Sequence, residues 1–251
     1  IKNSEKPFIL VGGGANLADA GDEVRVFAGK VQAPVGDTLM GKGAFDGTHE
    51  LYTGMVGMHG SKASNFGITE CDLLIVVGAR FSDRVTGNTA KFAKNARILQ
   101  LDIDPAEINK NIRTDASVIG DLKIILRRIN ARLDPQNHDE WVNHVERLKD
   151  MYPLSYKKDA LTGPAVVEAI YQATQGDAII VTEVGQHQMW AAQYYKYKQP
   201  RTLISSGGLG TMGYGLGAAI GAQMAIPHKQ VINIAGDGCF RMNMNEMATA
   251  V

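Results

Sequence analysis

The chain has 251 residues, of which 45% are apolar and 21% are charged, a composition typical of a globular protein with one large or two smaller domains. Lysine and arginine together number 26, as do aspartate and glutamate, so no net charge attracts nucleic acid or an anionic membrane. No apolar run approaches the roughly 18 residues of a membrane span, and the first residues carry no signal-peptide core. We therefore expect a cytoplasmic protein, or an organellar one in a eukaryote, with neither nucleic-acid nor membrane partners.

Short apolar runs alternate with helical patterns through the first half of the chain. Strands are predicted at Phe8–Val11, Ala33–Val35, Leu73–Val77, Ile98–Asp104 and Ser117–Ile119. Helices are predicted at 22–31 and at 121–133, where Asp121 supplies the N-cap. Strands that are separated by helices and short loops pair in parallel, so this half predicts a Rossmann-like parallel α/β sheet covered on both faces.

The pattern changes at residue 134 and resumes at residue 163. An amphipathic helix with Trp141, Val145 and Leu148 and a polar stretch follow, so 134–162 is predicted to connect two domains. A second series has strands predicted at 178–182, 202–204 and 231–235 and helices at 165–174, 186–195 and 214–225. The predicted organisation is a parallel α/β domain over 1–133, a connecting segment over 134–162 and part of a second parallel α/β domain over 163–251.

Three loops of the first half follow predicted parallel strands and should meet at one edge of the sheet. They are Gly12–Gly14, Gly78–Gly87 and Asp102–Asp104. Ligands of open α/β sheets bind at this edge, where Arg80 and Arg84 can hold phosphate and Asp102 can bind ribose hydroxyls. The dinucleotide fingerprint G-x-G-x-x-G is not met after Gly12, and surface ion pairs are an alternative role for both arginines. A fourth loop, Gly57–Gly60, either lines a flat aromatic cofactor or forms a mobile turn.

The second half repeats this arrangement of a strand followed by a turn. The segment Gly207–Gly217 runs into an apolar helix whose free N–H groups suit a diphosphate, although its glycines can also serve only close helix packing. Gln186 and His187 follow the strand predicted at 178–182 and can donate to phosphate oxygens, although a lone histidine is more often structural. Asp237 lies between two glycines at a strand end, where a carboxylate can bind Mg²⁺.

Several common catalytic motifs are missing from the sequence. The chain has no H-E-x-x-H, G-x-S-x-G or Walker A motif and no paired-cysteine spacing, which disfavours a zinc site and a serine hydrolase. The two cysteines, Cys71 and Cys239, lie far apart in the sequence, and we interpret both as reduced thiols.

Five segments combine these residues in a recognisable way: Gly57–Gly60, Arg80–Gly87, Gln186–Gln193, Ser205–Gly213 and Gly236–Gly238. Together they resemble the thiamine-diphosphate-dependent enzymes, and in particular the acetolactate synthase (acetohydroxyacid synthase) family. The resemblance covers nearly the whole chain. The Gly236–Gly238 segment is general to the superfamily, whereas Arg80–Gly87 and Gln186–Gln193 are specific to acetolactate synthase. The resemblance implies a central FAD-carrying domain followed by the first half of the thiamine-diphosphate-binding domain.

The resemblance also implies which residues of the first domain contact FAD. They are Gly13, Thr38, Leu39, Gly57, Met58, His59, Gly78, Arg80, Asp83, Arg84, Asp102, Ile103, Gly120 and Asp121. The flavin is largely structural in this family because the net reaction moves no electrons. Arg84 would in addition lie near the carboxylate of the substrate.

In the second domain the resemblance implies a site for thiamine diphosphate and Mg²⁺. The positions that would contact the cofactor are Gln186, His187, Gly210, Thr211, Met212, Gly238 and Cys239. Asp237 would ligate the Mg²⁺ ion, Met212 would hold the cofactor bent, and Cys239 stands where the family usually has serine. Gln186, Met212 and Arg84 are the residues that the resemblance places in catalysis.

The activity implied is that of acetolactate synthase in branched-chain amino acid biosynthesis. The family decarboxylates pyruvate and condenses the product with a second 2-keto acid, pyruvate or 2-ketobutyrate. The expected partners are further copies, as a homodimer or homotetramer, and a regulatory subunit. The chain departs from the family because it lacks an initiator methionine, the pyrimidine-binding domain with its activating glutamate, and the second metal ligand. We therefore expect this chain alone to be inactive.

Two other interpretations stay open at this point. Pyruvate oxidase, glyoxylate carboligase and sulfoacetaldehyde acetyltransferase share the cofactor chemistry, and the products formed from pyruvate would separate them. Alternatively, the first domain is an FAD- or ADP-binding module without catalysis, or the chain is a structural piece of a subunit interface.

Overall fold

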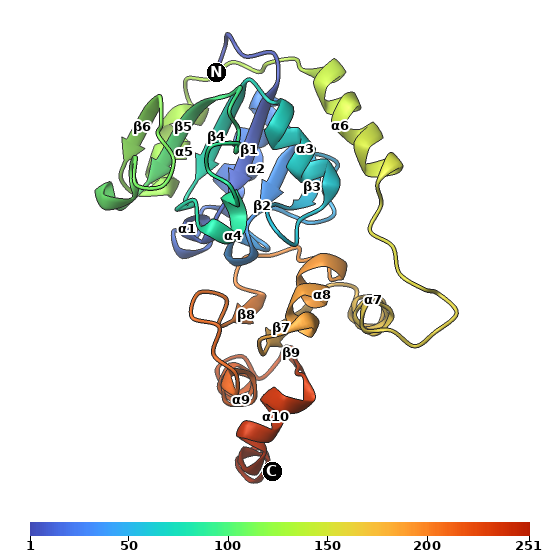
Figure 1. Cartoon of the computed structure of the whole chain (residues 1–251). Coiled ribbons are helices and arrows are strands. Elements are labelled where there is room, and N and C mark those ends of the chain that lie inside the picture. The colour runs from blue at the N-terminus through green and yellow to red at the C-terminus, as the bar shows by residue number, and fades with distance from the viewer. The chain divides into compact units, whose positions relative to one another are not determined.

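The computed structural model describes residues 1–251, and the chain folds as two units, Ile1–Leu154 and Ser155–Val251 (Figure 1). Each unit is built on a sheet whose strands are all parallel, which confirms the predicted α/β class. None of the helices has the length and apolar character needed to cross a bilayer.

Unit 1 contains a six-stranded sheet in the order β3-β2-β1-β4-β5-β6. Its strands are β1 (Pro7–Val11), β2 (Val35–Asp37), β3 (Tyr52–Met55), β4 (Leu73–Val77), β5 (Arg97–Asp102) and β6 (Ala116–Ile119). The chain moves outward from β1 to β3, returns to β4 beside β1, and then moves outward again to β6. The carboxyl ends of β1 and β4 therefore form the topological switch point, where doubly wound folds bind their ligands.

Both faces of the central strands β1 and β4 are buried, whereas the edge strand β6 is exposed. Successive residues of a strand point to opposite sides of the sheet. Ile9 and Ile75, which are paired in register, pack with α2 (Gly21–Val31) and α5 (Leu122–Asn130) on one face. Phe8 and Leu74 pack with α3 (Lys62–Glu70) and α6 (Asp139–Met151) on the other. The remaining helical segments of unit 1 are α1 (Gly13–Leu17), α4 (Asp83–Thr86), η1 (Leu39–Gly41) and η2 (Pro105–Glu107).

The amphipathic helix predicted from Trp141, Val145 and Leu148 forms as α6, and all three side chains are buried. The indole Nε1 of Trp141 donates to the backbone oxygen of Pro7 at 2.8 Å, so this helix is attached to the first residue of β1. Helix α5 begins as predicted, since the Asp121 carboxylate accepts a hydrogen bond from Ile124 N.

Some elements of unit 1 differ from the sequence prediction. The strand expected at 33–35 lies at Val35–Asp37, the turn expected at Gly12–Gly14 is the start of α1, and β3 and α3 were not predicted. Helix α3 contains Gly67, which lowers helix propensity. A Cβ atom at Gly67 would lie 2.6 Å from a ring carbon of Phe8, so packing against β1 requires glycine at this position. The same glycine is the reason that the helix was not predicted.

Unit 2 contains a three-stranded sheet in the order β8-β7-β9, with the buried strand β7 in the centre. Its strands are β7 (Ala178–Thr182), β8 (Leu203–Ser205) and β9 (Gln230–Ile234). Its helical segments are α7 (Gly163–Thr174), α8 (Gln186–Tyr194), α9 (Tyr214–Ala225), α10 (Asp237–Met242), η3 (Met244–Glu246) and α11 (Met247–Ala250). The core joins Ile180 of β7 to Val167 of α7, Ala191 of α8 and the aromatic pair Tyr195 and Tyr197.

Candidate functional site

Two turns of unit 1 are bonded to each other at the switch point. Gly12 N donates to Val77 O at 2.8 Å, and Gly14 N donates to Gly78 O at 3.0 Å. A Cβ atom at Gly12 would lie 2.2 Å from Gly78 O, so the two backbones approach as closely as glycine allows. The structure thus confirms that the loops after β1 and β4 share one edge of the sheet.

The segment after β2 lies against the same edge and carries Thr38 and Leu39, both half-buried. Thr38 N donates to Val11 O at 2.9 Å, and the Thr38 hydroxyl accepts from Gly41 N at 3.1 Å. A Cβ atom at Gly13 would lie 3.0 Å from the Cβ of Met40, which brings this segment directly beside α1.

A buried ion pair fixes both ends of this segment. Asp37 and Lys42 lie 3.0 Å apart (Oδ1 to Nζ), with only 1% and 4% of their side chains exposed. Tyr52 of β3 bridges them, because its hydroxyl donates to Asp37 Oδ2 at 2.9 Å and accepts from Lys42 Nζ at 2.6 Å. Burial raises the pKa of Asp37 above its usual value, although the charge of Lys42 opposes this shift.

The loop after β3 is bonded to the loop after β4. Met58 N donates to Arg84 O at 2.9 Å, and a Cβ atom at Gly57 would lie 2.4 Å from the same oxygen. Gly57 has φ +104°, a conformation that favours glycine. Met58 is 62% exposed, and the side chains of His59 and Arg84 are exposed as well.

The arginine loop itself is exposed and strained. Arg80 and Asp83 are exposed, and neither Arg80 nor Arg84 forms an ion pair within the chain, so the alternative of surface ion pairs is not realised. Between them, Phe81 is buried with φ +54°, a conformation that costs free energy in a residue with a side chain. The backbone of this loop is thus held in place by the burial of Phe81.

The loop after β5 completes the edge. Gly120 N donates to Asp102 O at 2.9 Å, and the buried Asp102 carboxylate accepts from Asp104 N at 3.1 Å. Ile103 is 68% exposed. The Asp121 carboxylate caps α5 through Ile124 N, so one of its oxygens already has a structural partner.

The residues on this edge fit a dinucleotide with a flat ring. Close backbone contacts at Gly12 and Gly57 hold the loops of this edge together. The guanidinium groups of Arg80 and Arg84 and the apolar side chain of Ile103 are exposed. These are groups that suit phosphate, ribose and an aromatic ring system.

In unit 2, His187 at the start of α8 lies between two glycines. Cβ atoms at Gly185 and Gly236 would each lie 3.0 Å from a ring atom of His187. The Nε2 atom of His187 is buried and has no hydrogen-bond partner within the chain, whereas Gln186 is exposed. Burial lowers the pKa of His187, and the nearby Glu183 carboxylate opposes this shift.

The starts of α8 and α10, which carry Gln186 and Asp237, meet the loop of Met212 at the carboxyl ends of β7 and β9. The Cys239 thiol donates to Val184 O at 3.2 Å, and a Cβ atom at Gly238 would lie 3.6 Å from the Cε of Met212. The side chains of Asp237 and Met212 are exposed, as are the neighbouring positions Gly210 and Thr211.

The donor chemistry at this end of unit 2 fits a Mg²⁺-bound diphosphate. Asp237 offers a carboxylate without an ion pair in the chain, and Mg²⁺ is usually held by one or two carboxylates plus phosphate oxygens. No cluster of three or more His, Cys, Asp or Glu side chains is arranged to bind a metal, so Asp237 would need oxygen ligands from elsewhere. Both cysteines are free and buried, as expected for reduced thiols.

Glu183 is a residue that the sequence reasoning missed. It follows β7 directly and is completely buried, and its Oε1 accepts from Gly215 N at 2.8 Å and Leu216 N at 3.3 Å. Two of the N–H groups at the start of α9, those of Gly215 and Leu216, are therefore already bound to a carboxylate within the chain. An acidic residue directly after a continuous apolar strand is the sequence signal that could have identified it.

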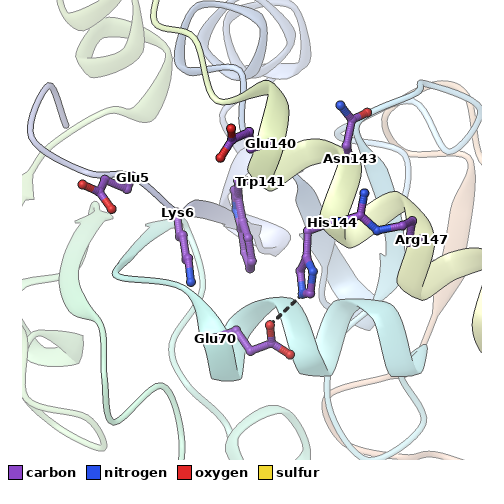
Figure 2. Close-up of a pocket in the computed structure, with 8 residues that line it drawn as sticks. All are labelled: Glu5, Lys6, Glu70, Glu140, Trp141, Asn143, His144 and Arg147. Atoms are coloured by element: carbon purple, nitrogen blue, oxygen red, sulfur yellow. Dashed lines mark hydrogen bonds and ion pairs between the residues drawn. The ribbon is translucent and has the colours of Figure 1, made fainter.

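A separate pocket of about 480 Å³ lies at the opposite, amino end of the unit 1 strands (Figure 2). Trp141 and His144 of α6 stack at 5.5 Å between ring centroids, and His144 Nε2 lies 2.7 Å from Glu70 Oε2. Lys6 and Arg147 also line this pocket. It contains none of the predicted site residues.

Two models of known protein families match this chain. The family model "Thiamine pyrophosphate enzyme, central domain" matches residues 1–129, and "Thiamine pyrophosphate enzyme, C-terminal TPP binding domain" matches residues 183–251. The chain is 46% identical to the probable acetolactate synthase large subunit of Methanocaldococcus jannaschii, an alignment that covers 99% of this chain and 44% of that protein.

Two further relatives give the same result. The chain is 47% identical to the acetolactate synthase large subunit of Lactococcus lactis subsp. lactis, over 98% of this chain and 43% of that protein. It is 43% identical to the acetolactate synthase isozyme 2 large subunit of Escherichia coli, over 99% of this chain and 45% of that protein. The chain thus spans less than half the length of these curated relatives.

Proposed function

Because this chain belongs to the family of thiamine pyrophosphate enzymes, we propose that it forms the central and diphosphate-binding parts of an acetolactate synthase. The reaction is the decarboxylation of pyruvate and the condensation of the product with a second 2-keto acid, pyruvate or 2-ketobutyrate. The observation that carries the proposal is that the starts of α8 and α10, with Gln186 and Asp237, meet the loop of Met212 at one end of the unit 2 sheet.

The residues of unit 2 bind and orient thiamine diphosphate. When bound, this cofactor supplies a thiazolium ring that accepts the electrons released as carbon dioxide leaves the substrate. The Gln186 amide and His187 Nε2 donate hydrogen bonds to the diphosphate, a role supported by the buried and unpartnered state of Nε2. Asp237 supplies a carboxylate oxygen to Mg²⁺, and the exposed Met212 supports the cofactor from one side.

The residues of unit 1 hold FAD in this proposal. Gly13, Gly57 and Gly78 contact the dinucleotide through their backbones, on loops that these glycines allow to pack closely against neighbouring parts of the chain, and Arg80 binds its phosphates. Arg84 binds the substrate carboxylate, a role supported by a guanidinium that is exposed and has no ion pair within the chain. The remaining flavin contacts are proposed at Thr38, Leu39, Met58, His59, Asp83, Asp102, Ile103, Gly120 and Asp121.

The assembly is proposed by analogy with the relatives. Their names describe a large subunit, which supports a small regulatory partner and an oligomeric enzyme, either a homodimer or a homotetramer.

We place the domain boundaries at 1–133, 134–162 and 163–251. The 251-residue chain by itself is inactive in this proposal, since a pyrimidine-binding domain and a second metal ligand are supplied elsewhere in the enzyme.

Binding of Mg²⁺ and thiamine diphosphate to the chain, measured by isothermal titration calorimetry, tests the proposal. Asp237→Asn is expected to weaken binding by about tenfold or more, because it removes the charge of the metal ligand. Asp159→Asn changes an exposed acid of the same unit and is the matched control. Equal affinity in all three proteins, or no binding to the unaltered chain, would contradict the proposal.

A second candidate function is an FAD- or ADP-binding module without catalysis. It is favoured by the complete doubly wound sheet of unit 1, which has its own binding edge. FAD or ADP should then raise the unfolding temperature of the chain while thiamine diphosphate does not. A rise with thiamine diphosphate and Mg²⁺ would favour the synthase instead.

A further inference from the structure

Glu183 places a charged group in the interior of unit 2. It is 0% exposed, directly after the buried strand β7, and its backbone N donates to Ile234 O of β9 at 3.2 Å. Burying a carboxylate is costly unless hydrogen bonds stabilise it. Two backbone N–H groups of α9, those of Gly215 and Leu216, bond to Oε1, whereas Oε2 is buried without a hydrogen-bond partner within the chain.

Helix α9 has no cap of its own. Its N-cap residue is Gly213, which carries no side chain and has φ +81°. The first N–H groups of a helix need acceptors from outside the helix, and an acid near this end also interacts favourably with the helix dipole. Glu183 therefore serves as the capping side chain, although it directly follows β7 and lies thirty-two residues before Gly215 in the chain.

The contact depends on the absence of a side chain at Gly215. A Cβ atom there would lie 2.9 Å from Glu183 Oε1 and 2.6 Å from Asn233 Oδ1. The helix can thus approach the carboxylate only with glycine at this position, which gives a specific reason for one glycine of the glycine-rich segment.

We propose that Glu183 is a positioning residue of the diphosphate site: by capping α9 it fixes the loop that carries Met212 and closes the end of this helix to the diphosphate. The inference rests on the proposed function and deepens it. The diphosphate is then directed to His187 and Asp237 at the starts of α8 and α10, where Nε2 of the imidazole lacks a partner and the carboxylate is exposed. The loop is connected to α10 as well, because Asn243 Nδ2 donates to Gly213 O at 2.7 Å.

Variants of Glu183 in the 251-residue chain test this inference. Glu183→Ala removes the cap and should weaken binding of Mg²⁺ and thiamine diphosphate by about tenfold, whereas Glu183→Gln keeps an oxygen acceptor and should stay within about threefold. Glu168→Ala is the matched control, because Glu168 is a half-buried acid of the same unit that bonds to Tyr156 instead of α9. The control should bind as the unaltered chain does.

Rescue by a small carboxylate separates positioning from a general loss of structure. In Glu183→Ala, formate can occupy the vacated acceptor position, so excess formate should restore most of the affinity and raise the unfolding temperature. Chloride at the same ionic strength should do neither, and formate should not affect Glu168→Ala. Should Glu183→Ala not fold, Gly215→Ala displaces the same carboxylate and is expected to show the same loss of affinity.

The outcomes distinguish this inference from the proposed function. If the unaltered chain does not bind thiamine diphosphate, the proposed function fails, and the formate-dependent unfolding temperature still tests the cap. If Glu183→Ala binds the cofactor as tightly as the unaltered chain, or if formate and chloride act equally, the inference is overturned. Loss of affinity in Glu183→Gln equal to that in Glu183→Ala would also contradict it.

Discussion

Asp37 and Lys42 form a buried ion pair 3.0 Å apart that encloses the segment with Thr38 and Leu39. Because the two charges have little contact with water, each depends on the other and on the Tyr52 hydroxyl. The segment between them is proposed to contact FAD, so the ion pair sets the position of a binding loop without facing the ligand.

Removing one partner of this pair should destabilise the chain strongly. Lys42→Met leaves the Asp37 carboxylate buried and unpaired, with an expected loss of about 3–5 kcal/mol in the free energy of unfolding. The double variant Asp37→Asn/Lys42→Met has no buried charge and should recover most of this loss. Urea unfolding of the three proteins measures both effects; a double variant as unstable as Lys42→Met would contradict the explanation.

The same variants should differ in their dependence on pH. The folded-state pKa of Asp37 is raised above 3.8, so the stability it contributes is present below that value and is lost as the pH rises through the folded pKa. Lys42 opposes the rise, and Lys42→Met should therefore lose more stability between about pH 4 and pH 8 than the unaltered chain. The double variant lacks the titrating group and should not show the added slope.

The contribution of His187 to the stability of unit 2 should change with pH in the opposite direction. Its folded-state pKa lies below 6.5, so its contribution to stability is present above 6.5 and is lost as the pH falls toward the folded value. His187→Asn should reduce the loss of unfolding temperature on acidification from about pH 7.5 to pH 5.5. The exposed His228 provides the control, since His228→Asn should leave the loss unchanged.

Two glycine substitutions in unit 1 should have opposite effects on stability. Gly57 lies at the edge proposed to bind FAD, whereas Gly29 lies on an ordinary helix surface. Gly57→Ala forces a Cβ to within 2.4 Å of Arg84 O at φ +104°, with an expected cost of about 1–3 kcal/mol and loss of any FAD-induced rise in unfolding temperature. Gly29→Ala lies in α2 with open space around it and should stabilise the chain by about 0.5–1 kcal/mol. A retained FAD effect in Gly57→Ala would count against this edge as the flavin site.

Cysteine reactivity should be low in the folded chain. Burial raises the pKa of Cys71 to about 12 from 9.0, which reduces its thiolate fraction by about a thousandfold, and the Cys239 thiol is buried against Val184 O. Iodoacetamide at neutral pH should therefore label neither residue rapidly. The same chain in guanidinium chloride is the control and should be labelled at both; rapid labelling of Cys71 in the folded chain would contradict its placement.

Strand positions could be predicted well where the core determines them. The continuous apolar runs at 73–77 and 178–182 form the centre of each sheet, because a strand buried on both faces needs no polar residue. The sequence did not predict helix α3, because it contains Gly67, which lowers helix propensity. Close packing of Gly67 against Phe8 overrides that propensity.

The sequence could predict which loops share an edge of each sheet, but not which distant residues bond to them. Turns after parallel strands meet at one edge by topology alone, which is why the loops of Gly12 and Gly78 were expected together. The bond from Gly215 N to Glu183 joins residues that are distant in sequence, and the ion pair of Asp37 and Lys42 depends on Tyr52. No local pattern encodes contacts of this kind.

The bonded turns at Gly12–Gly14 and Gly78 have a mechanical consequence. Since no side chain separates the two backbones, displacement of one turn moves the other, and the strained residue Phe81 lies only three positions beyond Gly78. A ligand that displaces α1 would thus also displace, through the main chain, the loop that carries Arg80 and Arg84.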